Sequence, residues 1–466
     1  MNIELMPHQV DGADFLSDRE AALLFWDAGA GKTYAAVRGC DLAHEKNVAD
    51  AFVPNPILAI TPAVNRRNLA NEFIKAQGRD RNIAVIEKGT DSFEDADVII
   101  TSFDLAAKHN VWERLMEMTF DVLILDELQY LKTPTSARAR AVFGGSRYGR
   151  DGLFGRAFQI WALSGTPAPN NISELFPWIR ATRPDLMAAL KPDGGRVTLD
   201  DFKMAFCRCL DTPYGLKIVG NREEEVRRLW DRLRGDISRI HKHDVLKDLP
   251  PVTFHDYEVT GDKTASKVRK LEAEYRDQIE MLLRDVTGIG IYDEHITTMR
   301  RVTEMAKVGD CIELVKNELL DGAMQKVVLF ANYIDTMDAL FEALEEFNPV
   351  MIRGDVTPLR RHQAITAFHE DDDVRVFIGQ VVAAGTAITL HADGKCADVI
   401  FVSADWVPAN NAQAVARVHR KGQHNNVHAR FLHLANSLDE QVSRSLMHKT
   451  YTLNEALDER KTHHAS

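Results

Sequence analysis

Residues 26–33, WDAGAGKT, combine small residues with an amine and a hydroxyl at the spacing of a phosphate-binding loop. Small residues let backbone N–H groups approach an anion closely, and a helix beginning at Lys32 adds the positive end of its dipole. Lys32 would then reach the β- and γ-phosphates of a nucleotide, and Thr33 would hold Mg²⁺. The small residues are Gly29, Ala30 and Gly31. Trp26 occupies the place of the usual first glycine in G-x-x-x-x-G-K-[ST], so an ordinary small-residue turn is the alternative for this stretch alone.

Two adjacent acids, Asp126 and Glu127, end the apolar run DVLILDE (121–127). Ligands of parallel sheets bind at the carboxyl ends of the strands, so these acids are expected in the same lobe as the phosphate loop. Asp126 would bind Mg²⁺, usually through water, and Glu127 would orient and deprotonate an attacking water. The alternative is a pair of solvated acids at a strand end.

A basic segment, QAVARVHRKGQ (413–423), lies far along the chain. If it is helical, Gln413, Arg417 and Arg420 fall at i, i+4 and i+7, on one face. Two guanidinium groups presented together would stabilise the charge that develops on a transferred γ-phosphate. A basic surface helix is the alternative.

Short, continuously apolar runs, each followed by a helical pattern, must position these side chains. Continuous apolar character is typical of strands buried on both faces. Strand–helix alternation predicts an α/β fold with parallel sheets covered by helices. The runs lie at 21–26, 56–61, 83–87, 97–102, 121–127, 159–166, 326–332, 349–355, 375–382, 398–406 and 427–435.

The region between the two sets of apolar runs is rich in charge and helical in period, as in EEEVRRLWDRLRGDISRI (223–240) and KVRKLEAEYRDQIEMLL (267–283). A chain of 466 residues is long enough for two to four domains. We predict an N-terminal lobe over residues 1–185, a helical insertion over residues 186–310, and a C-terminal lobe with a closing helix over residues 311–466.

The composition, 45% hydrophobic and 27% charged, is that of a soluble globular protein. No run of about 18 apolar residues predicts a membrane span, and the first residues do not have the pattern of a signal peptide. The five scattered cysteines are expected to be reduced thiols of a cytoplasmic protein. A net charge of −12 does not exclude nucleic acid, because a basic channel can lie inside an acidic shell.

In this order the three sites resemble those of superfamily-two helicase ATPases, specifically of the Swi/Snf branch. LMPHQVDGADFL (5–16) resembles the family's opening L-x-x-H/Y-Q-x-x-G-x-x-x-L, whose glutamine, here Gln9, reads adenine. The family's phosphate loop has the form D-x-G-x-G-K-T, which accounts for Trp26. RIHKHDVLKDLPP (239–251) resembles R-R-x-K-x-x-V-x-x-x-L-P-P, with Ile240 replacing the second arginine. H-R-x-G-Q at 419–423 is the sharpest signal of this branch.

The resemblance also implies residues that contact DNA or couple hydrolysis to its movement. DNA-backbone contacts are implied at the ends of two apolar runs, by Thr61, Pro62, Thr101 and Ser102. LSGTPAPNNISELF (163–176) resembles L-T-G-T-P-x-x-N-x-x-x-E-L, the coupling motif. The coupling residues carried over are Ser164, Gly165, Thr166 and Pro167. VVAAGTAITLHAD (381–393) resembles A-G-G-x-G-L-N-L and retains Gly385, and DELQ (126–129) keeps both acids of the usual D-E-A-H.

The resemblance covers the chain from about residue 5 to about residue 458. It implies two RecA-like lobes with helical insertions between them, ATP and Mg²⁺ as ligands, and DNA as the partner, with little sequence preference because the contacts would be to backbone. We expect a DNA-dependent ATPase that translocates on duplex or branched DNA and remodels protein–DNA complexes or forks. A strand-separating DNA helicase and a nucleotide-switched DNA-binding protein with weak hydrolysis are the alternatives. The compact form without accessory domains resembles bacterial or phage members, acting in the cytoplasm of a bacterium or an infected host cell.

Overall fold

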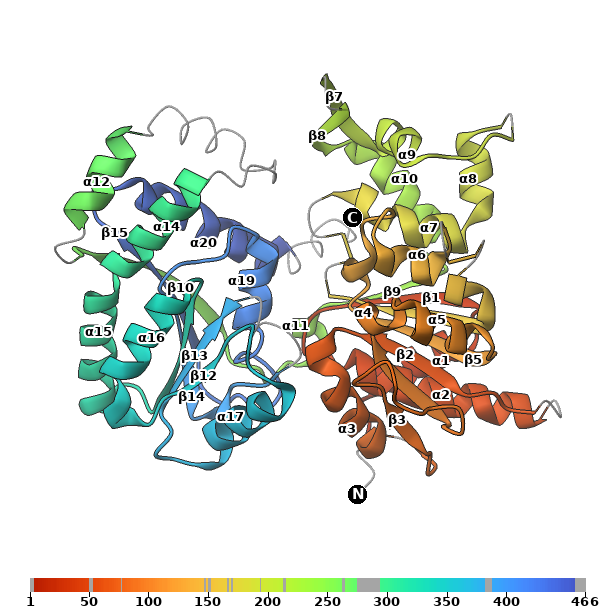
Figure 1. The fold of residues 1–466 in the computed structure, drawn as a ribbon, viewed down its shortest axis with the longest axis horizontal. Helices are drawn as coiled ribbons and strands as arrows, with labels where there is room; N and C mark the ends of the chain where they lie inside the picture. The colour runs from red at the N-terminus through yellow and green to blue at the C-terminus, as the bar shows by residue number, and fades with distance from the viewer. Residues whose placement is uncertain are drawn as a thin grey trace. The chain divides into compact units, whose positions relative to one another are not determined.

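The computed structural model describes residues 4–49, 53–76, 78–145, 148–149, 152–165, 167–168, 171–192, 194–212, 215–261, 265–274, 294–381 and 388–456. The chain forms two compact units, Met1–Val245 and Leu246–Ser466, each built around its own sheet (Figure 1). The predicted class, α/β with two parallel-sheet lobes, is confirmed. The predicted division at residues 185 and 310 stays a prediction.

The first unit contains a seven-stranded sheet in the order β3-β4-β2-β5-β6-β1-β9, and all its strand pairs are parallel. Every apolar run predicted in this part of the chain forms one of its strands. The strands are β1 (Ala21–Trp26), β2 (Ile57–Thr61), β3 (Ile83–Val85), β4 (Val98–Ser102), β5 (Phe120–Asp126), β6 (Ala157–Leu163) and β9 (Ile237–Ile240).

Successive residues of a strand point to opposite sides of the sheet. Because the strands are continuously apolar, both faces of this sheet are apolar. Leu58 and Ile60 of β2 enter one hydrophobic cluster, whereas Ile57 and Ala59 enter another. Helices α1–α3 cover the second cluster and helices α4–α7 cover the first (Figure 1). The helices are α1 (Pro7–Ser17), α2 (Lys32–Ala49), α3 (Arg66–Ala76), α4 (Phe103–Ala106), α5 (His109–Met116), α6 (Ala137–Phe143), α7 (Phe176–Thr182), α8 (Pro184–Leu190), α9 (Leu199–Phe206), α10 (Glu223–Leu233) and α11 (Lys242–Val245).

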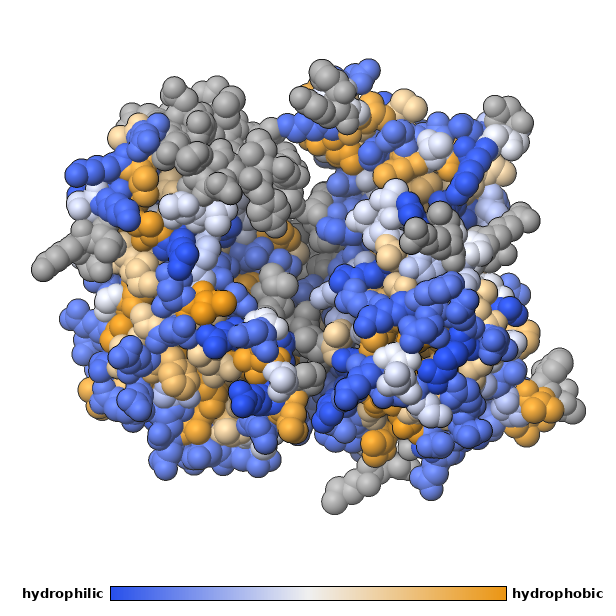
Figure 2. Space-filling view, viewed as in Figure 1, coloured by the Kyte–Doolittle hydropathy of each residue, from blue (hydrophilic) through white to orange (hydrophobic). Residues whose placement is uncertain are grey.

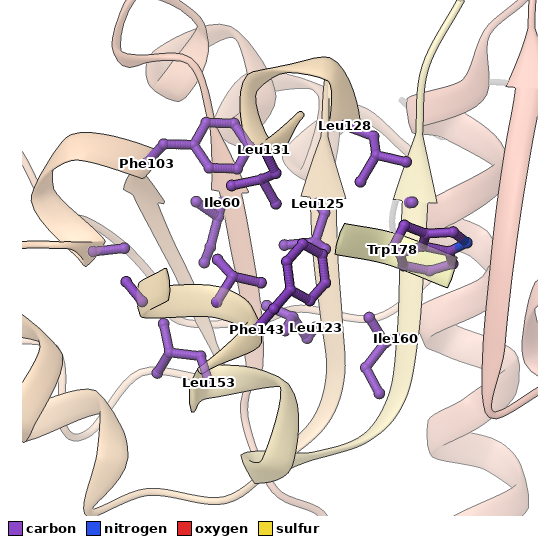
Figure 3. Packing of buried hydrophobic residues seen from close by; sticks show 14 of the residues in the cluster. Ile60, Phe103, Leu123, Leu125, Leu128, Leu131, Phe143, Leu153, Ile160 and Trp178 are labelled. Atoms are coloured by element: carbon purple, nitrogen blue, oxygen red, sulfur yellow. The ribbon is translucent and has the colours of Figure 1, made fainter. Parts of the chain in front are cut away.

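Figure 3 shows the cluster under α4–α7, in which Ile60, Leu125 and Ile160 from three neighbouring strands lie around Phe143. Each such side chain contributes about 1.5–3 kcal/mol when it is fully removed from water. This packing holds the carboxyl ends of β2, β5 and β6 in fixed register with one another.

The second unit contains a six-stranded parallel sheet in the order β10-β15-β14-β11-β13-β12. Val328 and Phe330 of β11 face a cluster that includes residues of α17, α19 and α20, and Val327 and Leu329 face the side of α15 and α16. The strands are β10 (Val252–Val259), β11 (Lys326–Ala331), β12 (Val350–Ile352), β13 (Val376–Gln380), β14 (Cys396–Phe401) and β15 (Val427–Leu434). The helices are α12 (Ala265–Glu274), α14 (Glu294–Ala306), α15 (Val308–Leu320), α16 (Ile334–Ala343), α17 (Pro358–Glu370), α19 (Pro408–Val415) and α20 (Leu438–Ala456).

The region expected to be a helical insertion contains strands as well as helices. The antiparallel hairpin of β7 (Cys207–Thr212) and β8 (Gly215–Asn221) follows α9, and β10 lies in the second sheet. The prediction of helix over residues 223–240 is wrong for its last residues, because α10 ends at Leu233 and β9 follows. There Leu23 N donates to Asp236 O at 2.8 Å, so pairing with β1 takes up the backbone groups that a longer helix would have used.

The visible face of each unit is mostly hydrophilic, with apolar residues in small patches (Figure 2). In the described residues, no helix combines the length and the hydropathy that crossing a bilayer requires.

Trp26 is fully buried at the end of β1, where its ring lies against Gly12 of α1. A Cβ added to Gly12 would lie 2.3 Å from Trp26 Cη2, well inside van der Waals contact. The glycine of the Q-x-x-G pattern is therefore needed for the approach of this ring.

Gly12→Ala is expected to lower the free energy of unfolding by about 1–3 kcal/mol, the usual cost of overpacking. Thermal unfolding of the full chain, followed by circular dichroism, measures this as a lower melting temperature. Gly235→Ala is the matched control, because nothing lies within 4 Å of its added Cβ. Equal melting temperatures for the two variants would contradict the packing of Trp26 on Gly12.

Candidate active site

The loop between β1 and α2 has the backbone of an anion cradle. Gly29 and Gly31 have φ angles of 88° and 81°, in the left-handed region that favours glycine. α2 begins directly at Lys32, so its first N–H groups adjoin the loop. The Lys32 ammonium group donates to Trp26 O at 2.9 Å and to Asp27 O at 3.2 Å. Thr33, half-buried, lies in the first turn of α2.

Gln9 is buried against this loop. Its Oε1 accepts a hydrogen bond from Met6 N at 2.9 Å, within the start of α1. A Cβ added to Gly31 would lie 2.0 Å from Gln9 Nε2, so the amide occupies the space beside the glycine. His8 Nε2 lies 2.9 Å from Ala30 O, which places a second residue of α1 on the loop.

Trp26 packs beneath the loop. Its indole N–H donates to Ser238 Oγ of β9 at 2.9 Å, and its ring is buried. The departure from the usual first glycine is therefore a packing feature of β1.

Asp27 joins the loop to a segment more than 200 residues further along the chain, a contact that was not predicted. Arg239 Nη2 lies 2.8 Å from Asp27 Oδ1, and Lys242 N donates to Asp27 Oδ2 at 2.9 Å. Arg239 Nη1 also donates to Phe25 O at 2.7 Å. The aspartate of D-x-G-x-G-K-T and the arginine and lysine of the 239–251 motif thus meet in one cluster. No spacing in the sequence indicates this pairing.

Asp126 ends β5 with its carboxylate buried. Its Oδ2 accepts hydrogen bonds from Thr61 Oγ1 and Asn65 Nδ2, both at 2.7 Å. Burial, together with the neighbouring charge of Glu127, raises the pKa of Asp126 to about 7. Asn65 was not predicted; its position one helical turn after Thr61 is the signal that was available.

The side chain of Thr61 is fully buried and orients Asp126, so a contact of Thr61 with DNA, which stays a prediction, would have to come from its main chain. β2 lies between β4 and β5, and helices cover both faces of the sheet, so a hydroxyl inside the strand cannot reach a partner in solvent. Thr101 of β4 is fully buried as well, and its contact with DNA also stays a prediction.

Glu127 lies in the left-handed region at φ 61° and is half-buried. Gln129 Nε2 donates to Glu127 Oε2 at 2.8 Å, and Ser164 Oγ donates to Gln129 Oε1 at 2.7 Å. This chain of hydrogen bonds joins the residues that follow β5 to those that follow β6. Gln129, which replaces the histidine of D-E-A-H, is the middle member of the chain.

The remaining predicted residues of the first unit lie near the same strand ends. A Cβ added to Gly165 would lie 3.4 Å from Ala28 N, so the turn after β6 adjoins the phosphate loop. Ser102 Oγ accepts from Leu105 N at 3.2 Å and caps α4. Pro62 and Pro167 are buried. Thr166 lies outside the described residues.

In the second unit, the expected helical face of Gln413, Arg417 and Arg420 does not form. α19 ends at Val415, so Gln413 is helical and the two arginines follow in a turn. After Val415 the chain tightens into a turn, in which Arg417 N donates to Ala414 O at 3.1 Å and Arg417 O accepts from Leu390 N at 2.8 Å. Arg417 is buried, and Arg420 Nη1 donates to Thr389 Oγ1 at 2.7 Å.

The H-R-x-G-Q residues shape this turn. Gly422 has a φ of 98°, and a Cβ there would lie 2.8 Å from the His391 ring. Gln423 Oε1 accepts from His424 N and Asn425 N, and Gln423 Nε2 donates to Cys396 O at 2.7 Å. The glycine and glutamine therefore fix the backbone that presents Arg420. Gly385 lies outside the described residues.

An anion cradle and two acids thus lie at the carboxyl edge of one parallel sheet, with β6 between the strands that carry them. Such an edge suits a phosphate group together with a divalent cation.

Comparison with protein families gives two matches. Residues 8–286 match the SNF2-related domain, and residues 309–422 match the helicase conserved C-terminal domain. The first match covers more than half of the chain.

Similar proteins come from several animals. The chain is 27% identical over 458 residues to the SWI/SNF-related matrix-associated actin-dependent regulator of chromatin subfamily A-like protein 1 of Xenopus tropicalis, covering 97% of this chain and 45% of that protein. It is 25% identical over 487 residues to the DNA annealing helicase and endonuclease ZRANB3 of Mus musculus, covering 99% and 41%. The chain therefore spans less than half the length of each of these two relatives.

Among solved structures, a Sulfolobus solfataricus SWI2/SNF2 ATPase core in complex with dsDNA is 21% identical to this chain. The TM-score is 0.45, and the match covers 98% of this chain and 93% of that one.

Asp126→Asn is expected to remove a pH dependence of stability. With its pKa raised to about 7, folded Asp126 holds a proton that the unfolded chain releases near pH 4. The stability from this proton is complete below about pH 4 and is lost as the pH rises towards 7. The asparagine variant cannot ionise, so its melting temperature relative to wild type should rise between pH 5 and pH 8. Melting temperatures of nucleotide-free protein across this range measure the difference, and a difference that is constant with pH would contradict the buried carboxylate.

Proposed function

Because the chain belongs to the SNF2-related family, we propose that it is a DNA-dependent ATPase that translocates on duplex or branched DNA. One observation carries the proposal: the two-glycine loop before Lys32 and the Asp126–Glu127 pair lie at the carboxyl edge of the same sheet. Family membership supplies ATP as the nucleotide. The matched helicase C-terminal domain supports a motor built from both units.

The first unit holds the triphosphate in this proposal. The N–H groups of the loop from Gly29 to Gly31 and the start of α2 bind the phosphates, and Lys32 moves from its own loop carbonyls onto the β- and γ-phosphates. Gln9, already against Gly31, contacts the adenine. Thr33 and Asp126 would hold Mg²⁺, which when bound neutralises phosphate charge. A buried carboxylate fixed through Oδ2 by two donors fits such an ion.

Glu127 is proposed as the group that orients and deprotonates water. Its carboxylate is bound to Gln129, and Gln129 is bound to Ser164, the first residue of the coupling motif. A displacement of Glu127 during hydrolysis would therefore be transmitted to Ser164 and the adjoining Gly165 through two hydrogen bonds. We propose this route, continuing to Thr166, as the coupling between hydrolysis and DNA movement.

Arg417 and Arg420 are proposed to stabilise the charge that develops on the γ-phosphate. Both precede the turn fixed by Gly422 and Gln423, which restricts the backbone of Arg420. A guanidinium already held in place loses less conformational freedom when it binds a phosphate. Gln413, one turn earlier on α19, is proposed as a further nucleotide contact.

The DNA contacts are proposed to be sequence-independent. The proposed contacts to the DNA backbone are Thr61, Pro62, Thr101, Ser102 and Gly385. The first four have buried side chains, so main-chain groups would make their contacts. The domain boundaries at residues 185 and 310 are proposed as well. One relative is named a DNA annealing helicase, which favours a motor that acts on branched or partly paired DNA over one that separates strands. Strand displacement on forked and blunt duplexes distinguishes the two activities. Hydrolysis that DNA does not stimulate would instead favour a nucleotide-switched binding protein.

Lys32→Ala is expected to lower DNA-stimulated ATP hydrolysis by about 10²-fold or more, since it removes a cation from the phosphates. Phosphate release is measured with no nucleic acid, single-stranded DNA, duplex, forked duplex and single-stranded RNA. Lys46→Ala, on the same helix and paired with Asp18 at the surface, is the matched control. Normal hydrolysis by Lys32→Ala would contradict the site, and a strong preference for single-stranded RNA would contradict the DNA motor.

Arg420→Ala is expected to lower kcat by about 10³-fold or more, the usual effect of removing an arginine that stabilises a phosphoryl transition state. ATP affinity should change little, because the phosphate loop is intact. Single-turnover hydrolysis and fluorescent-nucleotide binding separate the two effects. The neighbouring exposed Lys421, changed to alanine, serves as the control, and equal rates for the two variants would refute the role of Arg420.

A further inference from the structure

A histidine and three carboxylates gather at the edge of the second sheet, and none of the roles proposed above uses them. β10 is the edge strand, and its Asp256 and Glu258 lie two residues apart, on one face. His433 of β15 is the register partner of Glu258. α20 packs against both strands and brings Glu440 in its first turn (Figure 1).

His433 is buried, with 1% of its side chain exposed. Its Nδ1 lies 2.6 Å from Asp256 Oδ1. Two such atoms at this distance require a proton between them, which the imidazole Nδ1 carries because an ionised carboxylate has none. In the neutral ring, the form in which an imidazole binds a metal, Nε2 keeps its lone pair. Within the described part of the chain this nitrogen has no hydrogen-bond partner, and Glu258 Oε2 lies 3.7 Å from it.

The charge around the imidazole is unbalanced. Arg444 Nε lies 2.6 Å from Asp256 Oδ2, and Arg444 Nη1 lies 2.7 Å from Glu440 Oε1. One guanidinium thus faces three carboxylates around the imidazole. Buried or partly buried charge of one sign is costly unless a counter-charge accompanies it, and a divalent cation supplies one.

We propose that Glu258, His433 and Glu440 bind a divalent transition-metal ion, with Zn²⁺ as the physiological member of this class. One ligand atom from each residue lies within 4.8 Å of the others. Tetrahedral Zn²⁺, with bonds of about 2.0–2.2 Å, needs about 3.3–3.6 Å between ligand atoms. Glu258 is 60% exposed, so rotation of its side chain closes the difference. An imidazole nitrogen beside carboxylates favours Zn²⁺ over Mg²⁺ or Ca²⁺.

Two neighbours tune the proposed site in opposite directions. Asp256 is a positioning residue, because a carboxylate on Nδ1 fixes the ring and strengthens Nε2 as a ligand. Arg444 opposes the metal, because its cation occupies an oxygen of Glu440. The bound ion would tie the first turn of α20 to the edge strand β10 and so fix the closing helix on the sheet.

Zn²⁺ titration of the full chain, freed of metal by a chelator and without nucleotide, tests the proposal. Isothermal titration calorimetry is expected to show one Zn²⁺ per chain at this site, and Co²⁺ should give the visible absorption of a tetrahedral complex. Zn²⁺ should also raise the melting temperature. These readouts do not depend on ATP hydrolysis.

Variants identify the ligands. His433→Asn and Glu440→Gln should abolish the stoichiometric site, Asp256→Asn should weaken it by about 10–100-fold, and Arg444→Gln should strengthen it. His428→Asn is the control, because His428 lies on the same strand five residues away, on the opposite face, and should leave binding unchanged. If circular dichroism shows that His433→Asn does not fold, the partly exposed Glu440→Gln decides. Wild-type affinity in the ligand variants, or weak binding that all variants share, would overturn the proposal as adventitious binding to other histidines.

Discussion

The carboxylate of Asp27 holds together the two ends of the first unit. It receives Arg239 and the backbone N–H of Lys242, while Lys32 donates to the carbonyl of the same residue. The shape of the phosphate loop therefore depends on β9 and α11 as well as on its own glycines. β9 in turn adds the last strand beside β1, so the sheet edge and the loop are completed by one segment.

Asp126 and Glu127 are adjacent in the sequence but lie in different environments. Asp126 belongs to a strand covered on both faces, and its Oδ2 accepts hydrogen bonds from the side chains of Thr61 and Asn65; burial raises its pKa. Glu127 turns into the left-handed region and reaches Gln129 instead. Environments that differ in this way let two carboxylates take different roles, one holding a cation and the other handling a proton.

Local patterns predicted most of the fold, and long-range contacts account for what they missed. Continuous apolar runs located β5, which carries Asp126, and β1, which leads into the loop before Lys32, because such runs are buried on both faces. β9 was missed because four half-buried residues follow a charged helix, and only pairing with β1 makes them a strand. Arg417 lies outside its expected helix because the chain tightens into a turn after Val415, where Leu390 N donates to the Arg417 carbonyl. No local pattern could have paired Asp27 with Arg239, or removed Thr61 from the surface, because partners distant in the sequence decide both.

The loop residues Ala30 and Gly31 differ in which residue types their positions can accept. Ala30 carries a side chain, which is buried, and it is not among the residues with a positive φ. Gly31 is restricted twice, by its φ of 81° and by the Gln9 amide in the space where a Cβ would lie. A shorter side chain at position 9 would make room for a Cβ at position 31 but would leave the positive φ. No single second substitution would therefore allow Gly31 to be replaced without strain. The middle position of G-x-G accepts a small side chain, whereas the last glycine cannot change in a chain that keeps this loop.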